Sequence, residues 1–272
     1  MIKEISHIYI YPVKGLQGIS LSETQIESTG LLYDRRWMLV DENGLFLSQR
    51  TLPIMALFAL NQNVNGFEIW APGKKECITL PFVSESLTTM KVTVWDDTCD
   101  AIVHNRFCNE WFSALLKIKC KLVYMPVASK RMVDPTYNTG SDMVSFADAF
   151  PMLLIGQSSL TDLNTRLAEP VLMDRFRPNL VFTGGDAFEE DSYDEFYIGS
   201  QQFKAAKPCA RCTVITVNQQ TGAMGKEPLT TLATYRAKNN KIYFGQNLLQ
   251  TGNGIVKIGD QIHVKNRKPS II

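Results

Sequence analysis

Several hallmarks of membrane, secreted and nucleic-acid-binding proteins are missing from this sequence of 272 residues. No apolar run approaches the roughly 20 residues that a membrane-spanning helix needs, and the opening stretch MIKEISHIYIYPVKG lacks the basic segment and apolar core of a secretory signal. We therefore expect a cytoplasmic protein with no membrane partner. The 28 Lys and Arg residues are balanced by 27 Asp and Glu residues, so no overall field favours nucleic acid. Any bound anion must be held by a local cluster of cations.

Nucleotide-binding and repeat architectures are also missing. No strand, glycine-rich loop and helix follow one another as a nucleotide-binding unit requires, and no repeat of 20 to 50 residues is visible. The six cysteines, without a secretory signal, predict reduced thiols rather than a disulfide framework, most of them in the core. With 45% hydrophobic residues, the chain can bury a large core as one big domain or two intimate ones.

Short β-rich segments punctuated by turn residues make up most of the chain. Examples are EISHIYIYPV, KVTVWDD, KCKLVYMPV, RPNLVFTG and CTVITVN, with turn signals such as DENG, NVNG and QQTG between segments. Residues 105–117, 157–169 and 227–238 are predicted helices. The sequence thus predicts a mainly β (α+β) fold with a few peripheral helices. The polar, turn-rich stretch 125–142 predicts the seam between a domain at 1–125 and a domain at 126–272, with a mobile active-site loop as the alternative.

The stretch AAKPCARCTVITV contains the one closely spaced cysteine pair, Cys209 and Cys212. A redox dithiol of this spacing normally sits between a strand and a helix, whereas the β-branched residues after Cys212 predict a strand. A structural zinc ion needs four ligands, and the other cysteines and the three histidines are scattered. The spacing alone leaves open a dithiol switch, half of a zinc site, a single exposed thiolate and two half-buried core residues.

Basic and polar residues stand beside predicted strands elsewhere in the chain. YPVKG places Lys14 just past the end of a strand, and YDRRW places Arg35 and Arg36 at the start of another, where alternation sends the two side chains to opposite faces. In FRPNLVF, Arg177 precedes a proline, which we expect to hold its backbone extended, with Asn179 two residues on and on the same side. Singly, each fits an edge-strand lysine, a solvated arginine or a turn asparagine. Together they would give one site fixed cations beside a soft thiolate.

These segments carry a family resemblance that runs from near residue 3 to near residue 265. The motifs, in order, are YPVKG, YDRRWMLVD, SFADAFPMLLI, FRPNLVF, KPCARCTVITV, GKEPLTTLATYR and FGQNLLQTGNGIVKIGDQI. In this combination the chain resembles the two-part MOSC proteins, named after the C-terminal domain of molybdenum cofactor sulfurase. The resemblance implies a MOSC β-barrel at 126–272 packed on an N-terminal β-barrel domain at 1–125, with one molybdenum–molybdopterin cofactor at their interface.

The resemblance also implies the residues of that site. The cysteine of the RC step, Cys212, would ligate molybdenum, which suits a metal that already has soft dithiolene ligands. Arginine forks and a lysine point charge suit the pterin phosphate. The implied cofactor contacts are Lys14, Gly15, Arg35, Ala149, Arg177, Asn179, Ala210, Arg211 and Asn247. Gly15 and Ala210 stand where amidoxime-reducing members have serines, and Asn247 stands where they have an aromatic hydroxyl residue.

The implied activity is reduction of N-hydroxylated compounds, meaning hydroxylamines, amidoximes and N-hydroxylated bases. Asp148, and Asp34 beside Arg35, are candidates for donating or orienting a proton. The sequence has no flavin or haem signature and no C-x₄-C-x₂-C spacing for a plant-type iron–sulfur cluster, so we expect a separate flavin, haem or iron–sulfur protein to supply electrons. The alternative is a sulfur carrier or molybdopterin-binding module that uses a cysteine persulfide without turnover of its own.

Overall fold

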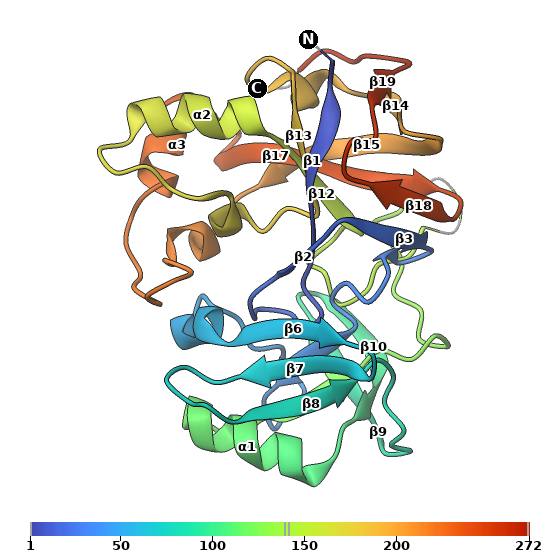
Figure 1. Ribbon diagram of the computed structural model, residues 1–272, viewed down its shortest axis with the longest axis vertical. Helices are drawn as coiled ribbons and strands as arrows, with labels where there is room; N and C mark the ends of the chain where they lie inside the picture. Colours follow the sequence, from blue (N-terminus) through green and yellow to red (C-terminus); the bar gives the residue numbers. More distant parts are fainter. Residues whose placement is uncertain (1, 139, 141, 271) are drawn as a thin grey trace.

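The computed structural model describes residues 2–138, 140, 142–270 and 272, and it shows two β-rich halves stacked along the long axis of the molecule (Figure 1). The lower half in this view has two antiparallel sheets. One has the order β5 (Trp37–Val40), β11 (Lys121–Tyr124), β10 (Asp97–Val103), β9 (Thr89–Val94), and the other is β6 (Ala59–Asn63), β7 (Gly66–Trp70), β8 (Cys77–Pro81). This mainly β architecture is the predicted fold class.

The upper half is built around one large mixed sheet. Its order is β19 (Ile262–Val264), β14 (Glu195–Ile198), β15 (Gln201–Ala210), β17 (Lys241–Thr251), β12 (Met152–Gly156), β13 (Leu180–Thr183), β1 (Glu4–Ile10), β2 (Ile19–Leu21), with β16 (Ala237–Lys238) on β17. A small sheet of β18 (Gly254–Lys257), β3 (Glu23–Glu27) and β4 (Gly30–Leu31) adjoins it.

The first strands of the chain therefore pair with strands from its end. β1 lies antiparallel to β13, with Ile8 opposite Leu180, and β3 lies antiparallel to β18. The chain reaches the lower half twice: in the turn after β1, where the Lys14 N–H donates to the carbonyl of Trp37 at 2.8 Å, and again after β4. Because of these crossings, the segments that carry Lys14 and Arg35 run between the halves. The proposed domain division at residues 125 and 126 remains a prediction, and Thr139 and Ser141 of the stretch 125–142 lie outside the described residues.

All three predicted helices form, each somewhat shorter than the pattern suggested: α1 (Arg106–Leu116), α2 (Gln157–Arg166) and α3 (Leu229–Tyr235). Asn105 caps α1, because its side-chain oxygen accepts the backbone N–H of Cys108 at 2.9 Å. Leu160 and Leu163 are buried on the inner face of α2. Short 3₁₀ turns complete the fold: η1 (Pro53–Leu57), η2 (Met173–Phe176), η3 (Glu189–Ser192) and η4 (Thr213–Thr216).

The prediction of a strand after Cys212 is wrong. β15 ends at Ala210, and the β-branched residues that follow form the 3₁₀ turn η4. Ile215 is buried there in an apolar cluster with Phe176 and Phe244. Packing at this corner of the barrel therefore overrides the β propensity of the segment.

The thiols are free, as predicted. Cys99, Cys108 and Cys120 are buried core residues, Cys77 is exposed, and Cys209 and Cys212 are half-buried. None of the helices in the described part of the chain is long and apolar enough to cross a membrane.

A buried ion pair joins the end of α3 to η3 and gives a test of the upper half. Arg236 donates to Asp191 at 2.5 Å, and both side chains are buried. Arg236→Ala would leave the Asp191 carboxylate buried without a partner, so we expect a loss of about 3–5 kcal/mol in the free energy of unfolding. The pair of Arg166 with Asp162 on α2 is the control, because water screens this exposed pair and Arg166→Ala should therefore have a much smaller effect on the free energy of unfolding. Urea denaturation followed by circular dichroism measures both values, and equal losses would contradict this account.

Candidate functional site

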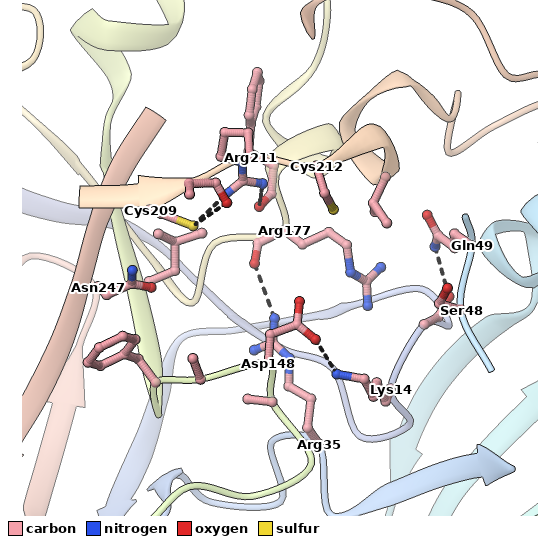
Figure 2. A pocket seen from close by; sticks show the side chains of 18 of the residues that line it. Lys14, Arg35, Ser48, Gln49, Asp148, Arg177, Cys209, Arg211, Cys212 and Asn247 are labelled. Atoms are coloured by element: carbon pink, nitrogen blue, oxygen red, sulfur yellow. Dashed lines mark hydrogen bonds and ion pairs between the residues drawn. The ribbon is translucent and has the colours of Figure 1, made fainter. Parts of the chain in front are cut away.

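A cavity opens where the two halves meet, and all eleven residues predicted for the site line it. Figure 2 shows its labelled side chains converging from several segments. The predicted residues in the lining are Lys14, Gly15, Arg35, Asp148, Ala149, Arg177, Asn179, Ala210, Arg211, Cys212 and Asn247. Further lining comes from Phe46, Ser48, Gln49, Arg50, Ala147, Phe150, Met152, Leu153, Phe176, Cys209 and Val214. The structure thus brings together residues that are more than 230 positions apart in sequence, while their roles stay predictions.

Arg35 reaches the cavity from a turn rather than from a strand. Its backbone is left-handed (φ 49°) and β5 begins only at Trp37. Arg35 Nη1 donates to Asp34 Oδ2 at 2.5 Å and to Asn179 Oδ1 at 3.0 Å, and Nη2 donates to the carbonyl of Arg177 at 3.2 Å. All three acceptors are groups of the protein itself. Arg35 therefore has a supporting role beneath the cavity.

Asp34 and Arg36 lie outside the lining of the cavity. Asp34 is 1% exposed and also accepts the backbone N–H of Tyr11 at 2.8 Å. Burial raises the pKa of Asp34, although Arg35 opposes this shift. Arg36 turns away, as predicted, and donates to the carbonyl of Met125 at 2.7 Å. Asp34 is therefore positioned to hold Arg35 rather than to reach a substrate.

The expectation of an extended backbone at Arg177 is wrong. Arg177 ends η2 in a left-handed conformation (φ 54°), with its N–H bonded to the carbonyl of Asp174. The following proline disfavours the right-handed helical region for Arg177. The hydrogen bonds of the Arg177 N–H and of its carbonyl then favour the left-handed region. Its carbonyl is the acceptor of Arg35 already described.

The guanidinium of Arg177 has no hydrogen-bond acceptor within the described residues. Figure 2 shows it extending into the middle of the cavity, with the only dashed line at its backbone oxygen. Its carbon lies 4.2 Å from the ring centre of Tyr11. Burial lowers the pKa of Arg177 to about 10, with the Tyr11 contact opposing and Arg35 assisting. The group stays charged at neutral pH and has donors free for an anion.

Tyr11 supports two arginines of the cavity, and the sequence analysis missed it. Its ring centre lies 4.3 Å from the Arg35 guanidinium as well as 4.2 Å from that of Arg177. Its hydroxyl donates to the carbonyl of Pro178 at 3.1 Å. One aromatic ring thus holds two like charges close together by cation–π contact. The available signal was the tyrosine at the head of YPVKG.

Lys14 and Asp148 form an ion pair across the cavity. Lys14 Nζ lies 2.5 Å from Asp148 Oδ1 and 2.8 Å from the carbonyl of Phe146. Desolvation would raise the pKa of Asp148, but Lys14, the Trp95 side chain and Arg50 outweigh it and hold that pKa well below its usual range. Burial lowers the pKa of Lys14 despite the carboxylate. Asp148 is therefore ionised at neutral pH, which suits it to orienting a group rather than to donating a proton.

The two cysteines differ in their surroundings. Arg211 Nη1 contacts Cys209 Sγ at 3.1 Å and Nη2 donates to the carbonyl of Phe176 at 2.7 Å. In the described part of the chain no hydrogen bond involves the sulfur of Cys212. Figure 2 shows the two sulfurs on either side of Arg211. Cys212 is thus the thiol left free for a ligand.

The charge of the cavity is strongly one-sided. Its lining includes the cations Lys14, Arg35, Arg50, Arg177 and Arg211 and the single carboxylate Asp148. Among the residues that the structure describes, no cluster of three or more histidine, cysteine or carboxylate side chains could hold a metal ion. A metal at Cys212 would therefore need its remaining ligands from a cofactor, and a pterin dithiolene with a phosphate fits both the free thiol and the excess of cations.

Two supporting contacts were also missed by the sequence analysis. Gln49 and Gln219 donate to each other's side-chain oxygens at 3.1 and 2.9 Å, and Gln49 donates to the carbonyl of Gly15 at 2.8 Å. Arg131, paired with Asp97 at 2.8 Å, donates to the carbonyls of residues 145, 147 and 148. The amide pair fixes the loop of Gly15, and Arg131 fixes the loop that presents Asp148.

Comparison with known proteins supports the resemblance to the two-part MOSC proteins over most of the chain. A family model described as the MOSC N-terminal beta barrel domain matches residues 2–119, and one described as the MOSC domain matches residues 141–263. The mitochondrial amidoxime reducing component 2 of Rattus norvegicus is 33% identical, with 95% of this chain and 82% of that protein covered. The mitochondrial amidoxime-reducing component 1 of Homo sapiens is 30% identical, with 96% and 82% covered.

A molybdenum cofactor sulfurase from Oryza sativa subsp. japonica is 31% identical over 89% of this chain, which corresponds to 32% of that larger protein. The chain therefore belongs to the MOSC family, in the group that combines an N-terminal MOSC β-barrel domain with a MOSC domain, and it has a molybdenum-cofactor-related role.

Proposed function

We propose that this protein binds a molybdenum–molybdopterin cofactor through Cys212 and reduces N-hydroxylated compounds. The observation that carries the proposal is a single unpartnered thiol inside a cavity with five cations and one carboxylate. The relatives of highest similarity above bear names that state amidoxime reduction. Lys14 and Arg35 are paired with carboxylates, and the other three cations of the lining favour an anionic ligand.

The reaction consumes two electrons and two protons. A hydroxylamine R–NHOH becomes the amine R–NH₂ and water, as the N–O bond breaks and one proton goes to nitrogen and one to oxygen. When bound, the cofactor supplies the redox chemistry of this step. We infer that the electrons come from a separate protein with a flavin, haem or iron–sulfur group, because the sequence has no signature for one.

The side chains of this protein divide the work of binding. Arg177 presents free donors to the cofactor's anionic group, and Arg35 holds the Arg177 carbonyl in place. Lys14 neutralises Asp148 and fixes its direction. The ionised carboxylate can then orient the nitrogen or oxygen of the substrate beside Cys212.

A persulfide carrier is the alternative that the sulfurase relative favours. In that role Cys212 would bear one additional sulfur atom and the protein would pass it on. A carrier has no evident use for an excess of four cations around the thiol, so the charge of the cavity favours the reductase. Mass spectrometry separates the two roles, because a labile extra sulfur on Cys212 without bound pterin would support the carrier.

Replacement of Cys212 tests the proposal directly. After expression in a molybdopterin-competent host, we expect Cys212→Ala to lose bound molybdenum and benzamidoxime reduction with a chemical electron donor, because the metal loses its protein ligand. Cys209→Ser is the matched control and should keep the metal, since the Cys209 sulfur already has Arg211 as a partner at 3.1 Å. Metal analysis and turnover measure both. Stoichiometric molybdenum and full activity in Cys212→Ala would refute the assignment.

Two of the four arginines that line the cavity, Arg177 and Arg35, should affect cofactor binding and protein stability differently. Arg177→Met removes a guanidinium without a hydrogen-bond acceptor, so the free energy of unfolding should change by less than about 1 kcal/mol. The cofactor content of this variant should nevertheless fall about tenfold or more. Arg35→Met leaves the Asp34 carboxylate buried without its cation, so the free energy of unfolding of the apoprotein should fall by about 3–5 kcal/mol. Urea melts and pterin analysis by fluorescence distinguish them. A strongly destabilised Arg177→Met with normal pterin content would contradict this division.

A further inference from the structure

A second, wider compartment adjoins the first and shares its thiol. It is lined by the turn 95–98, by residues 130–135 and by Leu229, Asn240, Lys241 and Ile242. Five residues line both compartments: Asp148, Ala149, Ala210, Arg211 and Cys212. A molecule in the second compartment can therefore reach the sulfur of Cys212 without passing through the cation-rich one.

The two compartments differ in charge. The second has four carboxylates, Asp96, Asp97, Asp134 and Asp148, and four cations, Lys130, Arg131, Arg211 and Lys241. Four minus four leaves no net charge, against five cations and one carboxylate in the first. The first compartment suits an anionic cofactor, whereas the second suits a neutral molecule.

Trp95 forms part of the wall of the second compartment, and its backbone conformation is unusual. It is the first of two residues in the turn between β9 and β10, where Val94 pairs with Asp97. Turns of this length need positive φ at that position and normally use Gly, Asn or Asp. Trp95 adopts φ 58° there. A bulky residue held in this region is strained, and such strain gathers at functional sites.

The surroundings of Trp95 fix its ring beside the shared part of the site. The Arg50 guanidinium lies 4.2 Å from the ring centre, and the Phe46 ring lies 5.4 Å away at 54°. The Trp95 side chain also helps to hold the pKa of Asp148 below its usual range. Yet Trp95 remains 45% exposed. The ring is thus a supported, partly uncovered aromatic surface next to the carboxylate that both compartments share.

We propose that the second compartment is the substrate chamber and that Trp95 is a specificity-determining residue, which stacks on flat aromatic N-hydroxylated substrates. The proposal rests on the proposed reductase function and adds the substrate class. The chamber also has apolar lining at Met132, Leu229 and Ile242, which suits an uncharged ring. A substrate stacked there would place its N-hydroxyl group toward Asp148 and Cys212, the residues common to both compartments.

Trp95 could instead act only by orienting Asp148, and two substrates separate these roles. Benzamidoxime has an aromatic ring, and hydroxylamine has none. Orientation of Asp148 would matter for both compounds, whereas stacking matters for benzamidoxime alone. Trp95→Gly removes the ring and suits the left-handed backbone, so the variant should fold. Trp95→Phe retains a smaller flat ring and serves as the matched control.

The experiment uses the cofactor-loaded protein and its two variants with a chemical electron donor. For Trp95→Gly we expect kcat/KM for benzamidoxime to fall about tenfold, mainly through KM, while kcat/KM for hydroxylamine stays within about twofold of the wild-type value. Trp95→Phe should lie between wild type and Trp95→Gly for benzamidoxime. Equal losses with both substrates, or unchanged benzamidoxime kinetics, would overturn the stacking role.

A binding measurement keeps this inference separate from the reductase proposal. Calorimetric titration of the oxidised protein with benzamidoxime, without electron donor, should show weaker binding to Trp95→Gly by the same factor. If wild-type protein reduces neither compound but binds benzamidoxime in a Trp95-dependent manner, the reductase proposal fails and the chamber stands. Binding that is independent of Trp95 would refute the chamber assignment.

Discussion

The buried ion pair of Arg35 with Asp34 is the constraint on which the candidate site depends. Asp34 lies beneath the cavity, where water cannot solvate it, and Arg35 neutralises it at 2.5 Å. The same guanidinium holds Asn179 and the carbonyl of Arg177. Because Asp34 follows β4 while Asn179 precedes β13, this network ties the chain crossing to the large sheet. A buried charge pair of this kind is costly to break from one side, so it fixes the relative position of these segments.

The cations of the first compartment are held apart by different means. Arg35 and Lys14 are paired with carboxylates, and Arg211 is held by a sulfur and a carbonyl. Arg177 and Arg50 instead lie against aromatic rings, Tyr11 and Trp95. Cation–π contact stabilises a guanidinium without using its N–H donors. The rings therefore keep two cations ready for an anion at a site where more carboxylates would have cancelled the charge.

Much of the site could be predicted from the sequence because its residues occur in short motifs that together resemble one family. The eleven residues of the predicted cofactor and catalytic set line the cavity, whereas Asp34, the further candidate, lies outside it. The local geometry could not be predicted in the same way. The left-handed backbone of Arg177 depends on a carbonyl contact from Arg35, 142 positions earlier. The 3₁₀ turn after Cys212 depends on packing against Phe176 and Phe244, which no local pattern encodes. Tyr11 looked like an ordinary strand residue because its role depends on two arginines from other segments.

The residues shared by the two compartments also depend on contacts from distant parts of the sequence. The shared residues Asp148 and Cys212 come from the C-terminal half, but Lys14 and Trp95, which both contact Asp148, come from the N-terminal half. Lys14 belongs to the chain crossing, which the buried network fixes. Trp95 belongs to a two-residue turn at the end of a hairpin, which can change in sequence without disturbing that network. The architecture therefore allows the proposed substrate chamber to vary while the network of Arg35, Asp34 and Asn179 is kept, with Arg50 as the one cation of the first compartment that contacts the Trp95 ring.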